Sequence, residues 1–155
     1  MLPKSVPASL VVCVLALALI GTPALGASIA LVSKTFFGGV AIDGYDPTAY
    51  FDAGEPAKGK RAHQLRWRDA KWRFASEDGA ARFKAQPEAY APRFGGYCTR
   101  AMAEDKVVDG DPKVWRLYQG RLYLFYAEPG ADLFDQDPDA MIAAAEAVWT
   151  RRTAD

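Results

Sequence analysis

The sequence predicts an α+β fold in one small domain, and three observations support this prediction. Segments 65–74 and 115–124 alternate apolar and polar residues around a central turn, which is typical of short antiparallel hairpins. Several short helical patterns surround the hairpins, and a longer C-terminal helix is expected at residues 138–152. The chain has 155 residues, and 50% of them are hydrophobic, which suffices for a packed core. We expect no internal repeat, and therefore one domain over residues 38–152.

The N-terminal segment is typical of an exported protein. Lys4 is followed by an uncharged run from Ser5 to Ser33, with small residues near Gly26. We expect residues 1–26 to be a signal peptide or, in the alternative, an uncleaved membrane anchor, because the run exceeds the ~20 residues that span a bilayer. Residues 27–37 are then a linker. Export places the protein in the periplasm or outside the cell.

The charge of the chain is balanced, which excludes one class of partner. The sequence holds 19 basic and 19 acidic residues, and removal of residues 1–26 takes away only Lys4. No basic stripe stands out along the chain. We therefore expect no nucleic-acid partner, because nucleic-acid binding needs a positive surface.

The first half of the domain predicts a short strand, a short helix and a hairpin. Val40–Ile42 has strand character, and Asp46-Pro47 offers a cap and a helix start. The hairpin turns at Asp69-Ala70, and its apolar face is aromatic. Its other face carries cationic side chains, which we interpret as a solvated surface or, if it binds, as a site for an anionic partner or lipid headgroups: Arg66, Arg68, Lys71 and Arg73.

The second half predicts further helices and a second hairpin. Ser76 caps a helix, and Pro87 stops or restarts it. A second hairpin turns at Gln119-Gly120, and the C-terminal helix begins after Asp137. Residues 102–108 favour neither a helix nor a strand.

Cys98 is the only cysteine outside the N-terminal apolar run, which holds Cys13. Gly95-Gly96 precede it and allow a sharp turn, because glycine adopts positive φ angles without a steric penalty. An odd cysteine in an exported protein is a buried thiol, an intermolecular partner or a ligand. Cys98 is therefore the first candidate for a site.

Four ordered sequence blocks resemble one protein family. They lie at Gly44–Phe51, Tyr90–Cys98, Asp111–Trp115 and Gly120–Leu124, and a fifth similarity runs from Phe74 to Tyr90. Together they are similar to the YHS domain family, in particular its exported stand-alone subgroup. The resemblance covers essentially the whole chain after the leader.

The resemblance does not bring a metal site with it. In YHS domains attached to heavy-metal transporters, cysteines that bind metal occupy positions matching Ala49, Ala75 and Gly79 of this chain. None of these three residues can ligate a metal. Any metal chemistry needs a different set of residues, centred on Cys98.

The leading hypothesis is a non-enzymatic module that binds or handles a soft metal such as copper. Cys98 and Met102 are four residues apart, a spacing that places both sulfurs on one face of a helix. Thiolate and thioether ligands select Cu(I). His63, the only histidine, is the proposed third ligand. A membrane protein is a possible physiological partner of such a module.

Two other hypotheses remain open. In the first, the chain is a small-ligand or protein-interaction module, Cys98 is buried in the core, and a pocket is formed by Tyr45, Gly95, Gly96 and Tyr97. In the second, which ranks below metal binding, Cys98 is a nucleophile with His63 as its base. We assign no catalytic residue.

Overall fold

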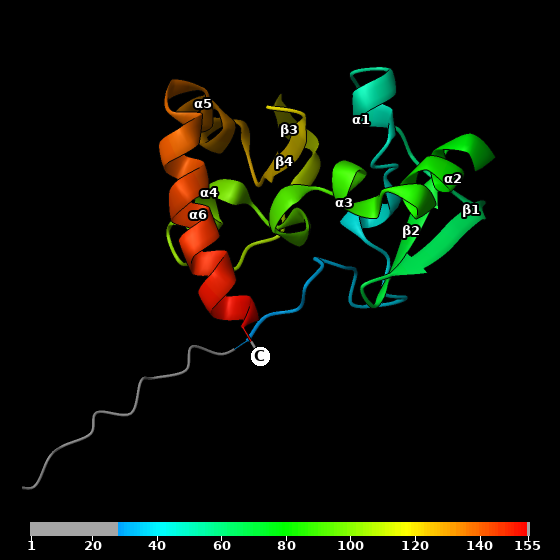
Figure 1. The fold of residues 1–155 in the computed structure, drawn as a ribbon, viewed down its shortest axis with the longest axis horizontal. Helices are drawn as coiled ribbons and strands as arrows, with labels where there is room; N and C mark the ends of the chain where they lie inside the picture. The colour runs from blue at the N-terminus through cyan, green and yellow to red at the C-terminus, as the bar shows by residue number, and fades with distance from the viewer. Residues whose placement is uncertain (1–27, 155) are drawn as a thin grey trace, which may run out of the picture.

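The computed structural model describes residues 28–154, and the leader expected at residues 1–26, with Cys13, lies outside them. The predicted α+β fold is confirmed: two antiparallel hairpins are combined with short helices and a long C-terminal helix (Figure 1). No helix in this part of the chain is both long and apolar enough to cross a membrane. The elements are, in order, η1 (Ile42–Gly44), α1 (Ala49–Asp52), β1 (Lys60–Trp67), β2 (Ala70–Phe74), α2 (Glu77–Ala85), α3 (Pro87–Tyr90), η2 (Arg93–Gly96), α4 (Thr99–Ala103), β3 (Asp111–Tyr118), β4 (Arg121–Phe125), α5 (Glu128–Gln136) and α6 (Pro138–Thr153).

The first hairpin forms where the alternation predicts it. Leu65 pairs with Trp72, and the side chains of Trp72 and Phe74 are fully buried against Phe83 of α2. The predicted cap is also present, because the Ser76 hydroxyl accepts a hydrogen bond from the Gly79 amide at 3.1 Å. The hairpin and α2 therefore enclose one aromatic cluster.

The hairpins belong to two copies of one structural unit, residues 40–90 and 91–153. Each unit has a 3-10 turn, a short helix, a hairpin, a nine-residue helix and a helix that begins at proline. The backbone bonds match as well: the Gly59 amide donates to the Gly44 carbonyl at 2.9 Å, and the Gly110 amide donates to the Gly96 carbonyl at 3.1 Å. The expectation of no internal repeat is therefore wrong.

The sequence signature of this repeat is faint but regular. Identical residues recur at matching positions of the two hairpin–helix segments, as in Phe74 and Phe125, Gly79 and Gly130, Phe83 and Phe134, and Pro87 and Pro138. Most other positions differ, because the two units pack against different surroundings. The spacing of the repeat predicts α5, whose N-cap residue, Ala127, makes no capping bond through its side chain.

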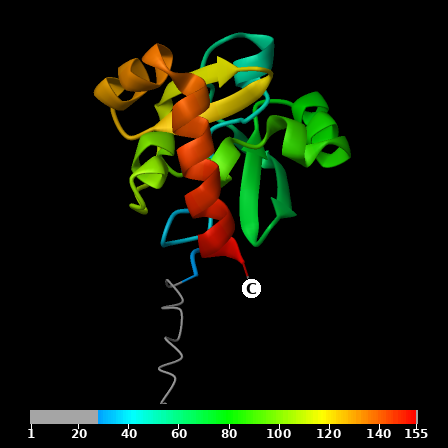
Figure 2. The same cartoon turned by 60° about the vertical axis from the view of Figure 1, so that its left-hand side comes forward.

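The strand β4 lies between the two hydrophobic clusters of the molecule. Successive strand residues point to opposite faces. Leu122 and Leu124 therefore enter the cluster of the first unit, and Tyr123 and Phe125 enter the cluster of the second. This double burial joins the units into one body, with α6 covering the outer side of the second unit (Figure 2).

Part of the segment expected as a linker, residues 27–37, is packed on the domain. The Ile29 amide donates to the Arg152 carbonyl of α6 at 3.1 Å. Val32 is buried, and the Ser33 amide donates to the Gly95 carbonyl at 2.9 Å. The folded part of the chain therefore begins before residue 38.

Candidate functional site

Cys98 sits at the start of α4, inside the second unit. Its side chain is only 4% exposed, and its sulfur accepts a hydrogen bond from the Ala101 amide at 3.5 Å. Its own amide donates to the Val108 carbonyl at 2.8 Å. Cys98 thus caps α4 while its thiol is covered by the core.

Met102 lies one turn further along α4 and is fully buried in the same hydrophobic cluster as Cys98. The repeat explains both positions: Asp46 matches Cys98, Tyr50 matches Met102, and these counterparts are buried too. The hydroxyl of Thr99, between the two sulfur residues, is buried without a hydrogen-bond partner in the described part of the chain. The two predicted sulfur ligands therefore both lie within one buried hydrophobic cluster.

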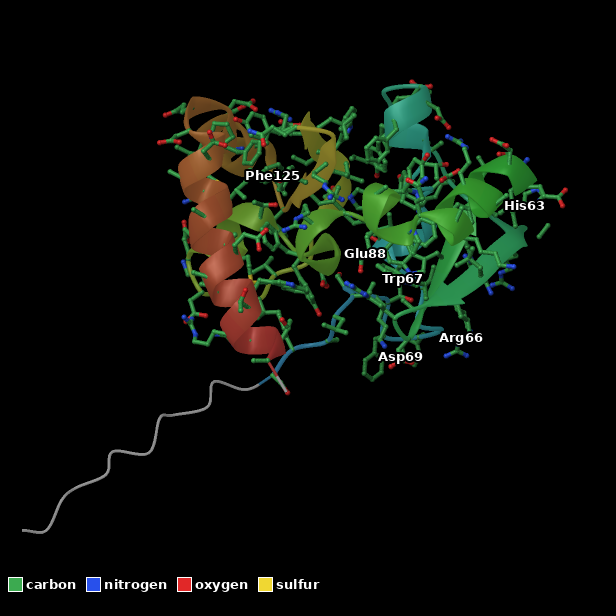
Figure 3. All side chains as sticks on the ribbon, in the orientation of Figure 1. His63, Arg66, Trp67, Asp69, Glu88 and Phe125 are labelled. Carbon is green, nitrogen blue, oxygen red and sulfur yellow. The ribbon has the colours of Figure 1, made fainter. Side chains whose placement is uncertain are left out.

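The structure does not bring His63 to these sulfurs. His63 is on β1 of the first unit, and Figure 3 places it on the side of the molecule opposite α4. Among residues 28–154, no three His, Cys, Asp or Glu side chains gather as a metal-binding group. A catalytic pair of Cys98 and His63 would also require the His63 ring to lie beside the Cys98 thiol, and the structure does not place it there. The copper site stays a prediction.

The four residues of the predicted ligand pocket do not line one cavity. A Cβ on Gly95 would lie 2.2 Å from the Leu31 carbonyl oxygen, and one on Gly96 would lie 2.7 Å from Ile42 Cγ2. These glycines therefore permit close packing between backbone and neighbouring groups. Tyr97 is buried, which raises the pKa of its hydroxyl. Tyr45 lines a separate hollow.

The hollow beside Tyr45 already contains a positively charged side chain of the protein, that of Lys58. It has a volume of about 630 Å³ and is lined by Asp43, Asp109, Asp111, Tyr45 and Tyr126, among others. The Lys58 ammonium lies 4.0 Å from the centre of the Tyr45 ring and donates to the Asp43 carbonyl at 2.8 Å. A lysine of the protein thus occupies the favourable position over the aromatic face.

A second cavity lies between the two units, and we call it the junction pocket. It encloses about 240 Å³. Trp67 and Glu88, which Figure 3 labels near the centre of the molecule, come from the first unit. Trp149 on α6 and Phe94 belong to the second unit, and their ring centres are 6.1 Å apart. Its charged lining residues are Arg68, Glu88, Arg93, Arg121 and Glu146.

Three arginines converge on the junction pocket, and their partners differ. Arg68 pairs with the Glu88 carboxylate at 2.7 Å, and Arg93 pairs with Glu146. Arg121 instead donates to the backbone carbonyl of Glu88 at 2.8 Å. Within the described residues Arg121 has no carboxylate partner, so its positive charge is not balanced by an ion pair.

Aromatic side chains share the walls of the junction pocket with charged ones. The guanidinium of Arg68 lies 4.4 Å from the centre of the Trp67 ring, and the Trp67 and Trp72 rings meet edge to face at 5.8 Å. These contacts hold the first unit's side of the pocket in place. A small ligand with a planar apolar part and a negative group would match this lining.

No protein-family model, curated protein or solved structure matches this chain. The resemblance to the YHS family therefore remains a resemblance.

Sequence reasoning did not find the junction pocket. Its walls come from the first hairpin, the segment at residues 88–95, β4 and α6. No local spacing connects these segments. The repeat is the signal that would have pointed to the junction between its two copies.

Proposed function

We propose that this protein is a binding module for a small anionic ligand, held in the junction pocket between its two units. The observation that carries the proposal is Arg121, whose guanidinium lines the pocket without a carboxylate partner in residues 28–154. Arginine binds carboxylates and phosphates through paired, planar hydrogen bonds. The ligand would place its negative group against Arg121.

The aromatic walls specify the rest of the ligand. Trp67 and Trp149 line the pocket from the two units, and the Arg68 guanidinium lies over the Trp67 ring. The volume of about 240 Å³ admits a small molecule rather than a peptide. An aromatic or short-chain carboxylate fits these dimensions and this chemistry.

This proposal follows the interaction hypothesis rather than the copper hypothesis. The thiol of Cys98 and the thioether of Met102 are buried among apolar side chains, so a metal could reach them only if the core opened. The junction pocket needs no such rearrangement. Its polar groups already line a cavity.

Intrinsic tryptophan fluorescence tests the proposal, because Trp67 and Trp149 line the pocket. The full chain is titrated with benzoate and with inorganic phosphate. We expect saturable binding of benzoate that Arg121→Gln weakens about 10-fold or more, since a hydrogen bond to a charged group contributes about 1.5–3 kcal/mol.

Arg66→Gln is the matched control. Arg66 is an exposed arginine on the outer face of the first hairpin and does not line the junction pocket. This variant should bind benzoate like the wild type. Absence of saturable binding of both probes, or equal binding by Arg121→Gln and the wild type, would refute the proposal.

A further inference from the structure

Two adjacent phenylalanines stand in solvent at the tip of a tight loop before the first unit. Phe36 is 94% exposed and Phe37 is 87% exposed. The loop is closed by the Thr35 amide, which donates to the Val40 carbonyl at 2.9 Å, and by the Thr35 hydroxyl, which donates to the Phe37 carbonyl at 2.8 Å. The backbone thus holds both rings outward.

The loop is fixed to the edge of the first hairpin. The Lys71 amide donates to the Gly39 carbonyl at 2.8 Å, and the Ala41 amide donates to the Lys71 carbonyl at 2.9 Å. The Lys34 ammonium donates to the carbonyl of Asp69 in the hairpin turn at 3.1 Å. The phenylalanine tip therefore lies beside the outer face of this hairpin.

That outer face is cationic. Phe37 shares a hollow of about 320 Å³ with Arg61, Lys71 and Arg73. Arg66 lies directly opposite Lys71 in the strand register, so it belongs to the same face. None of these four cations forms a salt bridge within residues 28–154. The only acidic residue of the hairpin and its turn is Asp69.

We propose that the Phe36–Phe37 loop and the cationic outer face of the first hairpin form a docking surface for an anionic phospholipid bilayer. Aromatic side chains settle at the boundary between headgroups and acyl chains. Lysine and arginine beside them are attracted to anionic headgroups. The loop supplies the aromatic side chains, and the hairpin supplies the lysine and arginine side chains.

The position of this surface in the chain supports a bilayer as the partner. The uncharged run that begins at Ser5 ends at Ser33, two residues before the loop. Figures 1 and 2 both place the loop at the end of the molecule where the chain enters at Ser28. A membrane reached by the N-terminal segment would face the two phenylalanines.

A fluorescent label on the loop tests this proposal in the full chain. In a Cys13→Ser background, Phe37→Cys is labelled with a polarity-sensitive dye and mixed with vesicles of phosphatidylcholine, with or without phosphatidylglycerol. We expect a blue shift and a severalfold increase in emission only with phosphatidylglycerol. The signal reports on the loop, so attachment through the N-terminal segment alone does not produce it.

Two controls make the outcome decisive. A label at Leu133→Cys, on α5 of the second unit, should not respond to either vesicle. Lys71→Gln/Arg73→Gln should raise the lipid concentration for half-maximal signal more than about tenfold, with an unchanged melting temperature. The proposal is overturned if the Phe37 label stays in water, responds equally to both vesicles, or is unaffected by the double substitution.

Discussion

The two hairpins share one topology and one register, but the outer face of the first is polar and that of the second is apolar. In the first unit the outer cross-strand pairs are Gln64–Arg73 and Arg66–Lys71, in which Gln64 and Arg66 are exposed and Lys71 and Arg73 are half-buried. In the second unit the matching pairs are Trp115–Leu124 and Leu117–Leu122. Leu122 and Leu124 are buried against the first unit, and the Trp115 ring meets Tyr50 at 5.2 Å.

This difference shows how one unit acquires two roles. On the apolar outer face of β3–β4, Leu122 and Leu124 are used to join the units, and only Leu117 at the end of the hairpin stays exposed. The polar outer face of β1–β2 stays at the surface, where its cations can interact with something outside the molecule. The outer-face residues of a hairpin, rather than its fold, therefore decide which copy builds the interface and which carries a surface for binding.

The largest effect should come from exchanging these outer faces. Leu124→Arg places the residue of the first unit, Arg73, at the buried position of the second. A charge without a partner in the core should lower the free energy of unfolding by more than about 4 kcal/mol, or prevent folding. Urea denaturation measures this.

The reciprocal change, Arg73→Leu, is the control. Arg73 is half-buried and donates to the Gln64 side-chain oxygen at 3.2 Å, and its replacement should alter the free energy of unfolding by only about 1 kcal/mol. Comparable losses in the two variants would mean that the outer faces are not distinct.

A smaller difference should separate the matching residues Asp46, which lies two residues before the N-cap of α1, and Cys98, which is the N-cap of α4. The Asp46 carboxylate is buried and accepts bonds from the Thr48 amide, the Thr48 hydroxyl and the Ala75 amide, each at 2.8 Å. Asp46→Ala should cost about 3 kcal/mol, because it leaves buried donors unpaired. Cys98→Ala, which removes one long bond, should cost about 1–2 kcal/mol. Thermal melts of both variants give the order, and a larger loss for Cys98→Ala would contradict it.

The matching glycines Gly44 and Gly96 offer a comparison of packing alone. Both have positive φ angles, 75° and 88°, so alanine is strained at either position. A Cβ at Gly44 meets its nearest atom at 3.5 Å, whereas one at Gly96 meets buried Ile42 at 2.7 Å. Gly96→Ala should cost about 2–3 kcal/mol and Gly44→Ala about 1 kcal/mol. Equal costs in urea denaturation would show that the tight contact is relieved freely.

The smallest effect concerns Tyr50, whose counterpart is Met102. Its hydroxyl donates to the Pro112 carbonyl at 2.7 Å, and burial is the main cause that raises its pKa. The unfolded tyrosine ionises near pH 10, so this stabilisation is complete below that pH and is lost as the pH rises above it. Tyr50→Phe should lower stability by about 1 kcal/mol at neutral pH. It should also weaken the loss of stability above pH 10; an unchanged alkaline profile would contradict this.

The fold was predictable from sequence at several local patterns. Two predictions for the first unit are wrong: Val40 and Ala41 form only isolated bridges and Ile42 begins the 3-10 turn η1, and α1 begins at Ala49 with Thr48, not Asp46, as its N-cap. The alternation around Asp69 and Gln119, the cap at Ser76 and the proline at residue 138 each determine an element within a few residues of chain. The repeat was not recognised, because its two copies diverged at the outer-face positions, such as Arg73 and Leu124, where the surroundings differ most. The identical residues that remain are mainly core aromatics and turn formers.

The candidate site was less predictable for a related reason. Met102 lies in α4 and Cys98 is its N-cap, but a spacing of four residues occurs equally in a buried core and in a ligand site. Arg121 and Trp149 approach the junction pocket only after the units associate. These residues are far apart in the sequence, so no local sequence pattern predicts that they line one pocket.

Cys98 is a buried cap of α4, and we propose that ligands bind elsewhere, in the junction pocket. The most direct test is the rate at which iodoacetamide alkylates Cys98 in the full chain, with and without Cu(I), with the Cys13 and Cys98 peptides resolved by mass spectrometry. We expect slow alkylation of Cys98 that accelerates only when denaturant unfolds the protein, with no effect of Cu(I) under native conditions. Fast alkylation of the native protein that Cu(I) suppresses would contradict the account and establish a metal site at Cys98.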